Sequence, residues 1–372
     1  MFPALSSLPQ FAAALDARKL APGLRHYNGS LVEHEGRIVL ATRVDDVRGF
    51  SRIELQRLRK DFVPVGASVS FPLEAAGTRH VEHEDPRLFV AGGKLWLAFV
   101  ELNGRHRDGL FTQELAELGA DLKPVRRIAL RYGRNGEKNE KNWIFFDAGA
   151  GRIGAVYSLH PHRVAIFDAG DGRLLAEHTT PGIERWHFGT LSGGTPAVRL
   201  GDGFIHFFHG YVPHLQRQRR YWLAAAVFEA RAPHACTLVS AQPLVWASAE
   251  DAAIVNPRRP GWNPLCIFPS GVIARDDSWL VSCGVNDSSL AVLRFTLADL
   301  ALVEPSRTAT NLAIAEGESA PAGDLVRVRV TKQPGGAIRT LGEPGGPYRS
   351  GEIFLTTIER ARALGAQIEL VG

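Results

Sequence analysis

The chain has 372 residues, of which 45% are hydrophobic and 22% are charged, and its formal net charge is +4. This composition is typical of a folded globular protein, and the charge is too low and too scattered to favour nucleic acid as a partner. The densest basic run, Arg217 to Arg220, is interpreted as a solvated loop.

Three cysteines, Cys236, Cys266 and Cys283, have neither metal-ligand spacing nor the even, dense count of a disulfide framework. A reducing compartment is therefore favoured. The N-terminus lacks a basic segment followed by a long apolar core, and no run of roughly 18 apolar residues occurs. We therefore expect a cytoplasmic protein without a membrane span.

Residues Leu8 to Leu20 predict a short helix, within an N-terminal extension of residues 1–25. From about residue 26 a unit recurs in which two apolar or aromatic arms flank a turn with Gly or Asp, which is typical of a β-hairpin. The five copies pair Asn28–Val32 with Arg37–Ala41, Arg87–Val90 with Lys94–Val100, Trp143–Phe146 with Ile153–Tyr157, Pro196–Val198 with Phe204–Phe208, and Cys266–Phe268 with Trp279–Ser282.

A repeat of this length with three or four strands per copy is typical of β-propeller blades. Long helical periodicity is absent from about residue 26 to 300. We therefore predict an all-β fold, with a five-bladed β-propeller over residues 26–305. Residues 306–372 hold a strand candidate, Leu325–Val330, and a helix candidate, Thr356–Leu364, which together predict a small α+β or barrel-like module of unassigned role.

Polar residues stand where several of the apolar arms begin, most clearly in Glu84-Asp85-Pro86-Arg87. In a propeller the innermost strands line one axis, so residues at one end of these strands meet in a single funnel. Carboxylates and amides bind sugar hydroxyls, aromatic rings pack on sugar faces, and a carboxylic acid can protonate a glycosidic oxygen. The residues expected in the funnel are therefore those of a carbohydrate site: Tyr27, Asn28, Glu84, Asp85, Lys141, Asn142, Trp143, Thr195, His209, Tyr211, Asn286 and Asp287.

Seven short motifs in this order resemble glycoside hydrolase family 130, the β-mannoside phosphorylases and β-mannosidases, and the related β-1,2-mannosyltransferase/phosphorylase group. The resemblance covers roughly residues 26 to 297 and rests on Asn28-x-Ser30, Glu84-Asp85-Pro86-Arg87, Lys141-Asn142-Trp143, Gly193-Gly194-Thr195-Pro196, Phe208-His209-Gly210, Phe268-Pro269-Ser270-Gly271 and Gly284-Val285-Asn286-Asp287.

This resemblance implies an inverting enzyme in which Asp85 is the catalytic acid and protonates the glycosidic oxygen through a hydroxyl of the bound mannose. It also implies that Asn28 and Asp287 hold the mannose, that His209 lies beside the incoming phosphate or water, and that Arg87 orients Asp85. With the other motif residues, the predicted substrate-binding set is Asn28, Ser30, Glu84, Arg87, Lys141, Asn142, Trp143, His160, Thr195, His209, Tyr211 and Asp287.

The chain departs from the family pattern at the phosphate site. The positions of the two phosphate-clamping arginines hold Asn142 and His160, and neither side chain binds phosphate in the bidentate manner of arginine. Phosphorolysis is therefore not favoured, and no cofactor is predicted. Hydrolysis is favoured, and so is transfer from an activated sugar. The phosphate of such a donor could be bound by Lys138, Lys141, His160 and His162.

Alternatives remain open for the function and for single residues. The protein could be a glycosyltransferase of polysaccharide assembly, or a propeller that binds glycans without chemistry. Asp85 could form a structural ion pair with Arg87, and Trp143 and His209 could belong to the blade cores. His80, Glu82 and Glu84 alternate along one strand, but a metal site is not predicted because surface strands often carry such clusters.

Overall fold

The structure is a computed structural model. It describes residues 25–45, 50–72, 81–103, 110–133, 135, 137, 139–183, 186, 190–213, 219–246, 266–305, 325–331, 340–341, 348–351, 353–357, 361–362 and 364–371. The helix predicted over Leu8 to Leu20 lies outside these residues. Within the described residues, no helix is long and apolar enough to cross a lipid bilayer.

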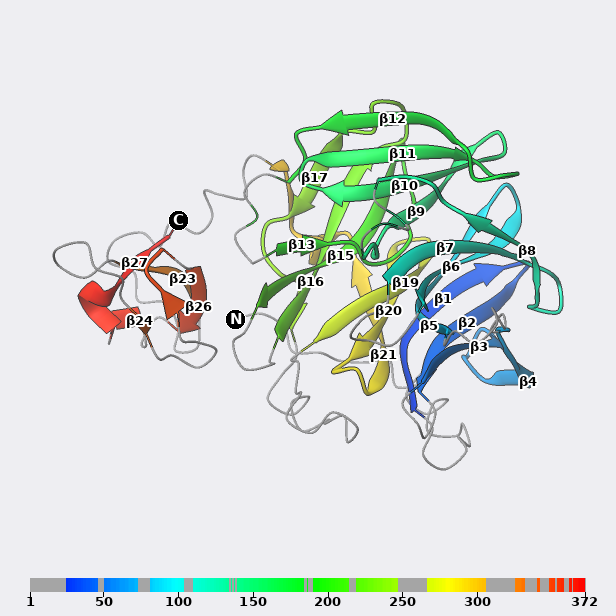
Figure 1. Cartoon of the computed structure of the whole chain (residues 1–372), viewed down its shortest axis with the longest axis horizontal. Helices are drawn as coiled ribbons and strands as arrows, with labels where there is room; N and C mark the ends of the chain where they lie inside the picture. The colour runs from blue at the N-terminus through cyan, green and yellow to red at the C-terminus, as the bar shows by residue number, and fades with distance from the viewer. Residues whose placement is uncertain are drawn as a thin grey trace.

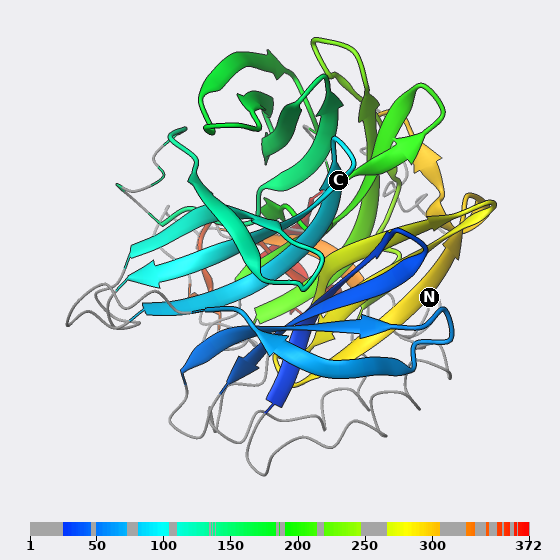
Figure 2. The same ribbon diagram turned by 90° about the vertical axis from the view of Figure 1, so that its right-hand side faces the viewer.

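The chain folds into five antiparallel sheets around a common axis, so the predicted five-bladed propeller is confirmed (Figures 1 and 2). The first three blades have four strands each, in chain order. Blade 1 comprises β1 Arg25–His34, β2 Arg37–Asp45, β3 Ser51–Leu58 and β4 Pro64–Ser70; blade 2 comprises β5 Val81–Ala91, β6 Lys94–Asn103, β7 Leu110–Leu118 and β8 Pro124–Ala129; blade 3 comprises β9 Ile144–Gly149, β10 Arg152–Leu159, β11 His162–Asp168 and β12 Leu174–Thr180.

Blades 4 and 5 depart from this plan. In blade 4 two short strands pair with the same neighbour, β15, and β22 returns after blade 5 to extend the outer edge. Blade 4 comprises β13 Thr190–Ser192, β14 Val198–Leu200, β15 Gly203–Pro213, β16 Arg219–Glu229, β17 Cys236–Ser240, β18 Val245–Trp246 and β22 Leu302–Val303; blade 5 comprises β19 Ile267–Arg275, β20 Ser278–Val285 and β21 Ser289–Thr296, followed by the 3₁₀ helix η3, Ala298–Leu300.

The C-terminal residues form separate small sheets. The predicted strand Leu325–Val330 is confirmed as β23, which pairs with β26 (Ile353–Thr357) and β27 (Ile368–Leu370). The predicted helix over Thr356–Leu364 is wrong at its start, because Thr356 and Thr357 end the strand β26 and pair with β23. The remaining elements are β24 Thr340–Leu341, β25 Tyr348–Arg349 and the 3₁₀ helix η5 Gly365–Gln367.

The core is divided into five apolar clusters, each of which lies between two neighbouring blades. This arrangement buries both faces of a blade, which explains why β2 is buried along nearly its whole length rather than at alternate residues. The cluster that contains Leu31 and Leu40 of blade 1 also contains Leu280 and Val292 of blade 5. Apolar packing between the first and last blades therefore closes the ring.

Buried hydroxyl groups join neighbouring blades near the axis. Ser30 Oγ in blade 1 accepts a hydrogen bond from the Leu88 backbone N–H in blade 2, at 2.8 Å. Ser282 Oγ in blade 5 accepts one from the Leu31 backbone N–H in blade 1, at 3.0 Å. Because both hydroxyls are buried, these bonds satisfy inner-strand amides that water cannot reach.

Candidate active site

The polar residues on the axis interrupt inner strands rather than begin them. β1 starts at Arg25 and β5 at Val81, so Asn28 and Asp85 lie inside these strands, and the expectation that they mark strand starts is corrected. Both residues sit at β-bulges, where the register shifts between Tyr27 and Ser30 and between Glu84 and Arg87. A bulge re-aims a side chain, and here it turns two polar side chains toward the axis.

Five non-glycine residues around the axis have left-handed backbones, and all of them are Asn or Asp, the types that tolerate this region best. Such conformations are uncommon elsewhere in proteins and concentrate at functional sites. The residues and their φ angles are Asn28 (47°), Asp85 (48°), Asn142 (67°), Asn286 (52°) and Asp287 (50°).

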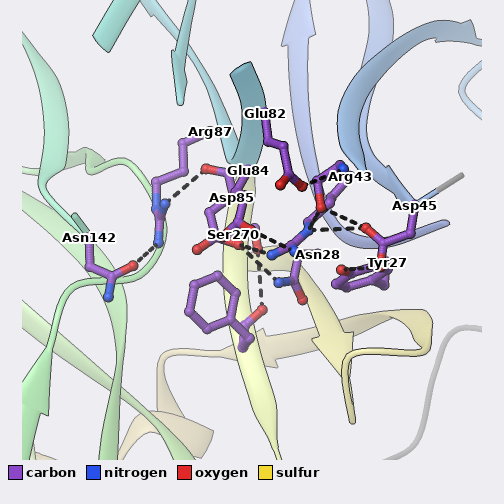
Figure 3. Close-up of polar contacts among 12 residues, drawn as sticks. Tyr27, Asn28, Arg43, Asp45, Glu82, Glu84, Asp85, Arg87, Asn142 and Ser270 are labelled. Carbon is purple, nitrogen blue, oxygen red and sulfur yellow. Dashed lines mark hydrogen bonds and ion pairs between the residues drawn. The ribbon is translucent and has the colours of Figure 1, made fainter. Parts of the chain in front are cut away.

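The Asp85 carboxylate lies between an amide and a guanidinium (Figure 3). Asn28 Nδ2 donates a hydrogen bond to Asp85 Oδ1 at 3.1 Å, and Arg43 Nη1 lies 3.7 Å from the same oxygen. Arg43 Nη2 is 2.7 Å from Glu84 Oε1. All four side chains are buried, so these charges interact in surroundings that water screens weakly.

Arg43 and its partner Asp45 are site residues that the sequence did not predict. Burial alone would lower the pKa of the Arg43 guanidinium, but Glu84, Tyr27 and Asp45 together raise it well above its ordinary value. Asp45 also accepts hydrogen bonds from Tyr27 Oη at 2.8 Å and from Ser51 Oγ at 2.7 Å. The available signal was an Arg and an Asp, Arg43 and Asp45, at alternate positions of an otherwise apolar and buried strand.

Two carboxylates of the candidate metal group have protein partners. Glu82 Oε2 accepts a hydrogen bond from the Ser51 backbone N–H at 2.8 Å, and Glu84 pairs with Arg43. The third member, His80, lies outside the described residues. No group of three or more potential metal ligands occurs among the residues described.

Arg87 joins four blades through one fully buried guanidinium. It donates to the Asp85 backbone carbonyl at 3.0 Å, to Asn142 Oδ1 at 2.8 Å and to the Gly194 carbonyl at 2.5 Å. Its Cζ lies 5.3 Å from the centre of the Phe268 ring. Arg87 therefore holds the Asp85 main chain, whereas the cation nearest the Asp85 carboxylate is Arg43. Burial lowers the pKa of Arg87 to about 10.

His209 lies close to this guanidinium and is buried beside the Phe268 and Tyr221 rings. Burial is the largest cause that lowers its pKa to about 3, and the positive charges of Arg87 and Lys141 act in the same direction. His209 is therefore a neutral imidazole at neutral pH. Tyr211 follows two residues later on β15, with its ring centre 6.4 Å from that of His209.

Three predicted substrate-binding residues are instead part of the framework. Ser30 makes the blade-to-blade bond described above, and Thr195 Oγ1 accepts a hydrogen bond from the Phe207 backbone N–H at 3.0 Å. Trp143 is fully buried and stacks on Phe167 in the cluster between blades 2 and 3. Direct substrate contact by these three side chains is therefore not supported, because the fold already encloses them.

The remaining predicted residues divide between the axial cluster and a neighbouring cavity. Asp287 follows β20 and is close enough to Tyr27 to help raise the pKa of that phenol, although burial is the larger cause. Asn142, Lys141 and His160 line a cavity between blades 3 and 4. Asn142 Nδ2 donates to Ser192 Oγ at 2.9 Å, so Asn142 connects this cavity to Arg87.

Glycines allow the inner strands to approach each other at the site. A Cβ atom at Gly284 would overlap Asn28 Oδ1, and a Cβ atom at Gly193 would overlap the Asn142 carbonyl oxygen. Both glycines belong to motifs that sequence analysis singled out. Their role follows from close packing rather than from chemistry.

Comparisons with known proteins place the fold. No protein-family model matches the sequence, and no curated protein matches it. A β-1,2-mannobiose phosphorylase from Listeria innocua, in complex with β-1,2-mannobiose, matches with a TM-score of 0.56 at 16% identity, over 77% of this chain and 94% of its own.

Two further solved structures match over similar lengths. One is a putative glycoside hydrolase from Parabacteroides distasonis, with a TM-score of 0.55 at 16% identity over 73% of this chain and 86% of its own. The other was determined for the glycoside hydrolase family 130 of mannoside phosphorylases, described as containing hydrolases that target β-1,2-mannosidic linkages in Candida mannan. It has a TM-score of 0.51 at 15% identity over 74% of this chain and 85% of its own. At these identities the likeness establishes that the chain has the fold of these enzymes.

Proposed function

We propose that the protein is a carbohydrate-active enzyme that cleaves or transfers a mannosidic linkage with inversion, and that Asp85 is its catalytic acid. The observation that carries the proposal is the placement of the Asp85 carboxylate on the axis, on a left-handed bulge residue, between Asn28 and Arg43. The names of the structures that share the fold, and the motif resemblance, support mannose as the sugar.

The charge of the axial cluster supports a hydroxyl-rich substrate. Three buried acidic side chains, Asp45, Glu84 and Asp85, lie 3.5, 2.7 and 3.7 Å from the Arg43 guanidinium, and a fourth, Glu82, accepts a hydrogen bond from the Ser51 backbone N–H. Carboxylates accept hydrogen bonds, and sugar hydroxyls supply donors without adding charge. An anionic ligand in the same place would lie against the carboxylates of this cluster and be repelled by them.

In the proposed reaction, the proton of Asp85 passes through a sugar hydroxyl to the glycosidic oxygen as the bond from that oxygen to the anomeric carbon breaks. A water molecule or an acceptor hydroxyl forms the new bond on the opposite face of the ring, which gives inversion; the proton that this nucleophile loses passes to solvent, from which Asp85 is protonated again. Arg87 positions the Asp85 main chain, and Asn28 binds the carboxylate on the other side. The neutral imidazole of His209 lies beside Arg87 and contributes a polar group without a second positive charge.

The test is a product assay on short β-linked manno-oligosaccharides, with and without inorganic phosphate. We expect phosphate-independent release of sugar, and a loss of at least about 100-fold in Asp85→Asn, because general acid catalysis contributes roughly 10²- to 10⁴-fold. Asp277→Asn, which changes an exposed aspartate on the β19–β20 turn, is the matched control. Phosphate-dependent formation of sugar-1-phosphate would contradict the assignment of the nucleophile, and full activity in Asp85→Asn would contradict that of the acid.

Transfer from an activated donor is the second candidate function, because the cavity beside Asn142 offers room for an acceptor next to the axis. An elongated glycan formed from a sugar-nucleotide or sugar-phosphate donor, in the absence of cleavage, would favour it. Binding of manno-oligosaccharides without turnover of any donor would instead indicate a glycan-binding propeller.

A further inference from the structure

A cavity of about 360 Å³ opens between blades 3 and 4, beside the axial cluster. Its wall is formed by the start of β9, by β10 and by β13. Sites for small molecules have volumes of roughly 300–1,000 Å³, so the cavity can hold a group of modest size.

The floor of this cavity is apolar. Ile144, Val156, Ile183 and Leu191 line it and belong to the apolar cluster between blades 3 and 4, together with Trp186. The polar atom of the Trp186 ring is already used, because Nε1 donates to the Ser240 carbonyl at 2.9 Å. The floor of the cavity therefore presents hydrocarbon and ring surfaces to a ligand.

The polar groups of the cavity wall are also largely engaged within the protein. Tyr157 Oη donates to Glu140 Oε1 at 2.7 Å, and Ser158 Oγ donates to the Pro161 carbonyl at 2.6 Å. Among the described residues that line the cavity, Lys141 is the one Lys or Arg, and its Nζ lies 5.0 Å from the centre of the Phe111 ring. A phosphate ion would find no guanidinium here to bind in a bidentate manner.

The cavity is connected to the proposed catalytic acid through a single side chain. Asn142 lines the cavity and accepts a hydrogen bond from Arg87, which also donates to the Asp85 backbone carbonyl (Figure 3). Gly193 lines the cavity too, and the next residue, Gly194, accepts the third hydrogen bond of Arg87. Arg87 and Asn142 therefore link the main chain of Asp85 to the wall of the cavity.

We propose that this cavity binds the part of the substrate on the far side of the scissile bond, and that it selects an apolar alkyl or aryl group there. The inference rests on the proposed function for its connection to catalysis. The apolar floor sets the chemical class of the group that it contacts, since burying hydrocarbon is favourable. The substrate class is thus a glycoside with an apolar aglycone, such as an alkyl glycoside.

The test is calorimetric binding of S-linked glycosides, which resist cleavage, to the full-length wild-type protein. Octyl 1-thio-β-D-mannoside is compared with methyl 1-thio-β-D-mannoside. We expect the octyl compound to bind at least about tenfold more tightly, since each buried methylene contributes roughly fourfold in affinity. Inorganic phosphate should not displace it. Equal affinity for the two compounds, or displacement of the octyl compound by phosphate, would overturn the proposal.

Variants locate the effect in the cavity. Leu191→Asn keeps the size of a cavity side chain but makes it polar, and should remove most of the octyl preference while leaving the affinity for the methyl compound unchanged. Leu191→Ala, a milder truncation, should reduce the preference and serves where the Asn variant unfolds. Leu175→Asn makes the same change on the exposed outer strand β12 and should alter neither affinity. A preference that survives in both Leu191 variants would contradict the assignment.

The sugar part of the ligand is tested separately with octyl 1-thio-β-D-glucoside. It is compared with methyl 1-thio-β-D-glucoside. If mannose is the wrong sugar, the octyl glucoside should still bind more tightly than the methyl glucoside, and only the proposed substrate of catalysis fails. If the octyl preference is absent in both pairs while manno-oligosaccharides are cleaved, the proposed function stands and the cavity proposal fails.

Discussion

Two buried histidines between blades 3 and 4 should make the propeller sensitive to mild acid. His162 on β11 and His206 on β15 both pack against Phe228, with ring centres 5.6 and 5.9 Å from its own. Burial is the main cause that lowers the pKa of His162 to about 4 and that of His206 to about 3. The positive charge of a neighbouring histidine, His234 for the former and His162 for the latter, acts in the same direction.

The direction of the effect follows from proton binding. In the unfolded chain each histidine has a pKa of about 6.5, so the unfolded state takes up protons below that pH while the folded state does not. The free energy of unfolding is therefore fully retained above about pH 6.5 and falls as the pH is lowered toward the folded-state values. Because both folded values lie below 5, each histidine should cost about 2 kcal/mol between pH 7 and pH 5, and the pair about 4 kcal/mol.

The assay is urea unfolding of the wild type and His206→Leu at pH 7, 6 and 5. Carboxylates contribute to acid unfolding in both proteins, so the difference between the two pH profiles isolates His206. We expect the variant to lose about 2 kcal/mol less than the wild type between pH 7 and pH 5. His34→Leu makes the same substitution at a partly exposed histidine and is the control. Identical profiles for the wild type and His206→Leu would refute the reasoning.

Two further predictions concern the axial framework. Gly284→Ala places a Cβ atom over the Asn28 side chain, 2.9 Å from its Cγ and 3.0 Å from its backbone N, where 3.4–4 Å is ordinary contact. The resulting displacement of Asn28 should lower kcat/KM about 100-fold. If the losses of the single variants simply add in the Gly284→Ala/Asn28→Ala double variant, the clash is contradicted. Ser30→Ala leaves the buried Leu88 N–H without its acceptor and should cost about 1–3 kcal/mol in urea unfolding. Ser70→Ala, at an exposed strand end, is its control, and a drop in substrate affinity at unchanged stability would restore Ser30 as a substrate ligand.

The fold could be predicted because its signals are local. Each hairpin has two apolar arms and a turn with Gly or Asp, and all five hairpins occur in the structure. In the fifth, however, Trp279–Ser282 pair with Gly271–Ala274 and not with the predicted arm Cys266–Phe268. The bulges could not be predicted in the same way. The polar residues before the apolar run Leu88–Val90 were interpreted as a strand start. A bulge, however, accommodates Pro86, because a bulged residue leaves the ladder and needs no backbone N–H, so β5 continues on both sides of it.

The site was only partly predictable, because its contacts join blades that are far apart in sequence. Asn28, Glu84, Asp85, Arg87 and Asn142 were all predicted and are brought together. Arg43 was missed, since its place in β2 gives no sign of which carboxylates of other strands it meets. The buried hydroxyls of Ser30 and Thr195 were assigned to the substrate although they bind backbone N–H groups of other strands.

The position of Arg87 implies that folding and the proposed catalysis depend on the same contacts. A buried guanidinium is costly to desolvate, and the fold offsets this cost with three oxygen acceptors and the Phe268 ring, contributed by four different blades. One of these acceptors is the backbone carbonyl of Asp85, and another is the side chain of Asn142 at the cavity. Since lysine cannot reproduce this planar set of bonds, a change at Arg87 would alter blade contacts, the orientation of Asp85 and the cavity wall together. The axis is therefore both the structural centre of the propeller and the place where a bound ligand can act on the proposed acid.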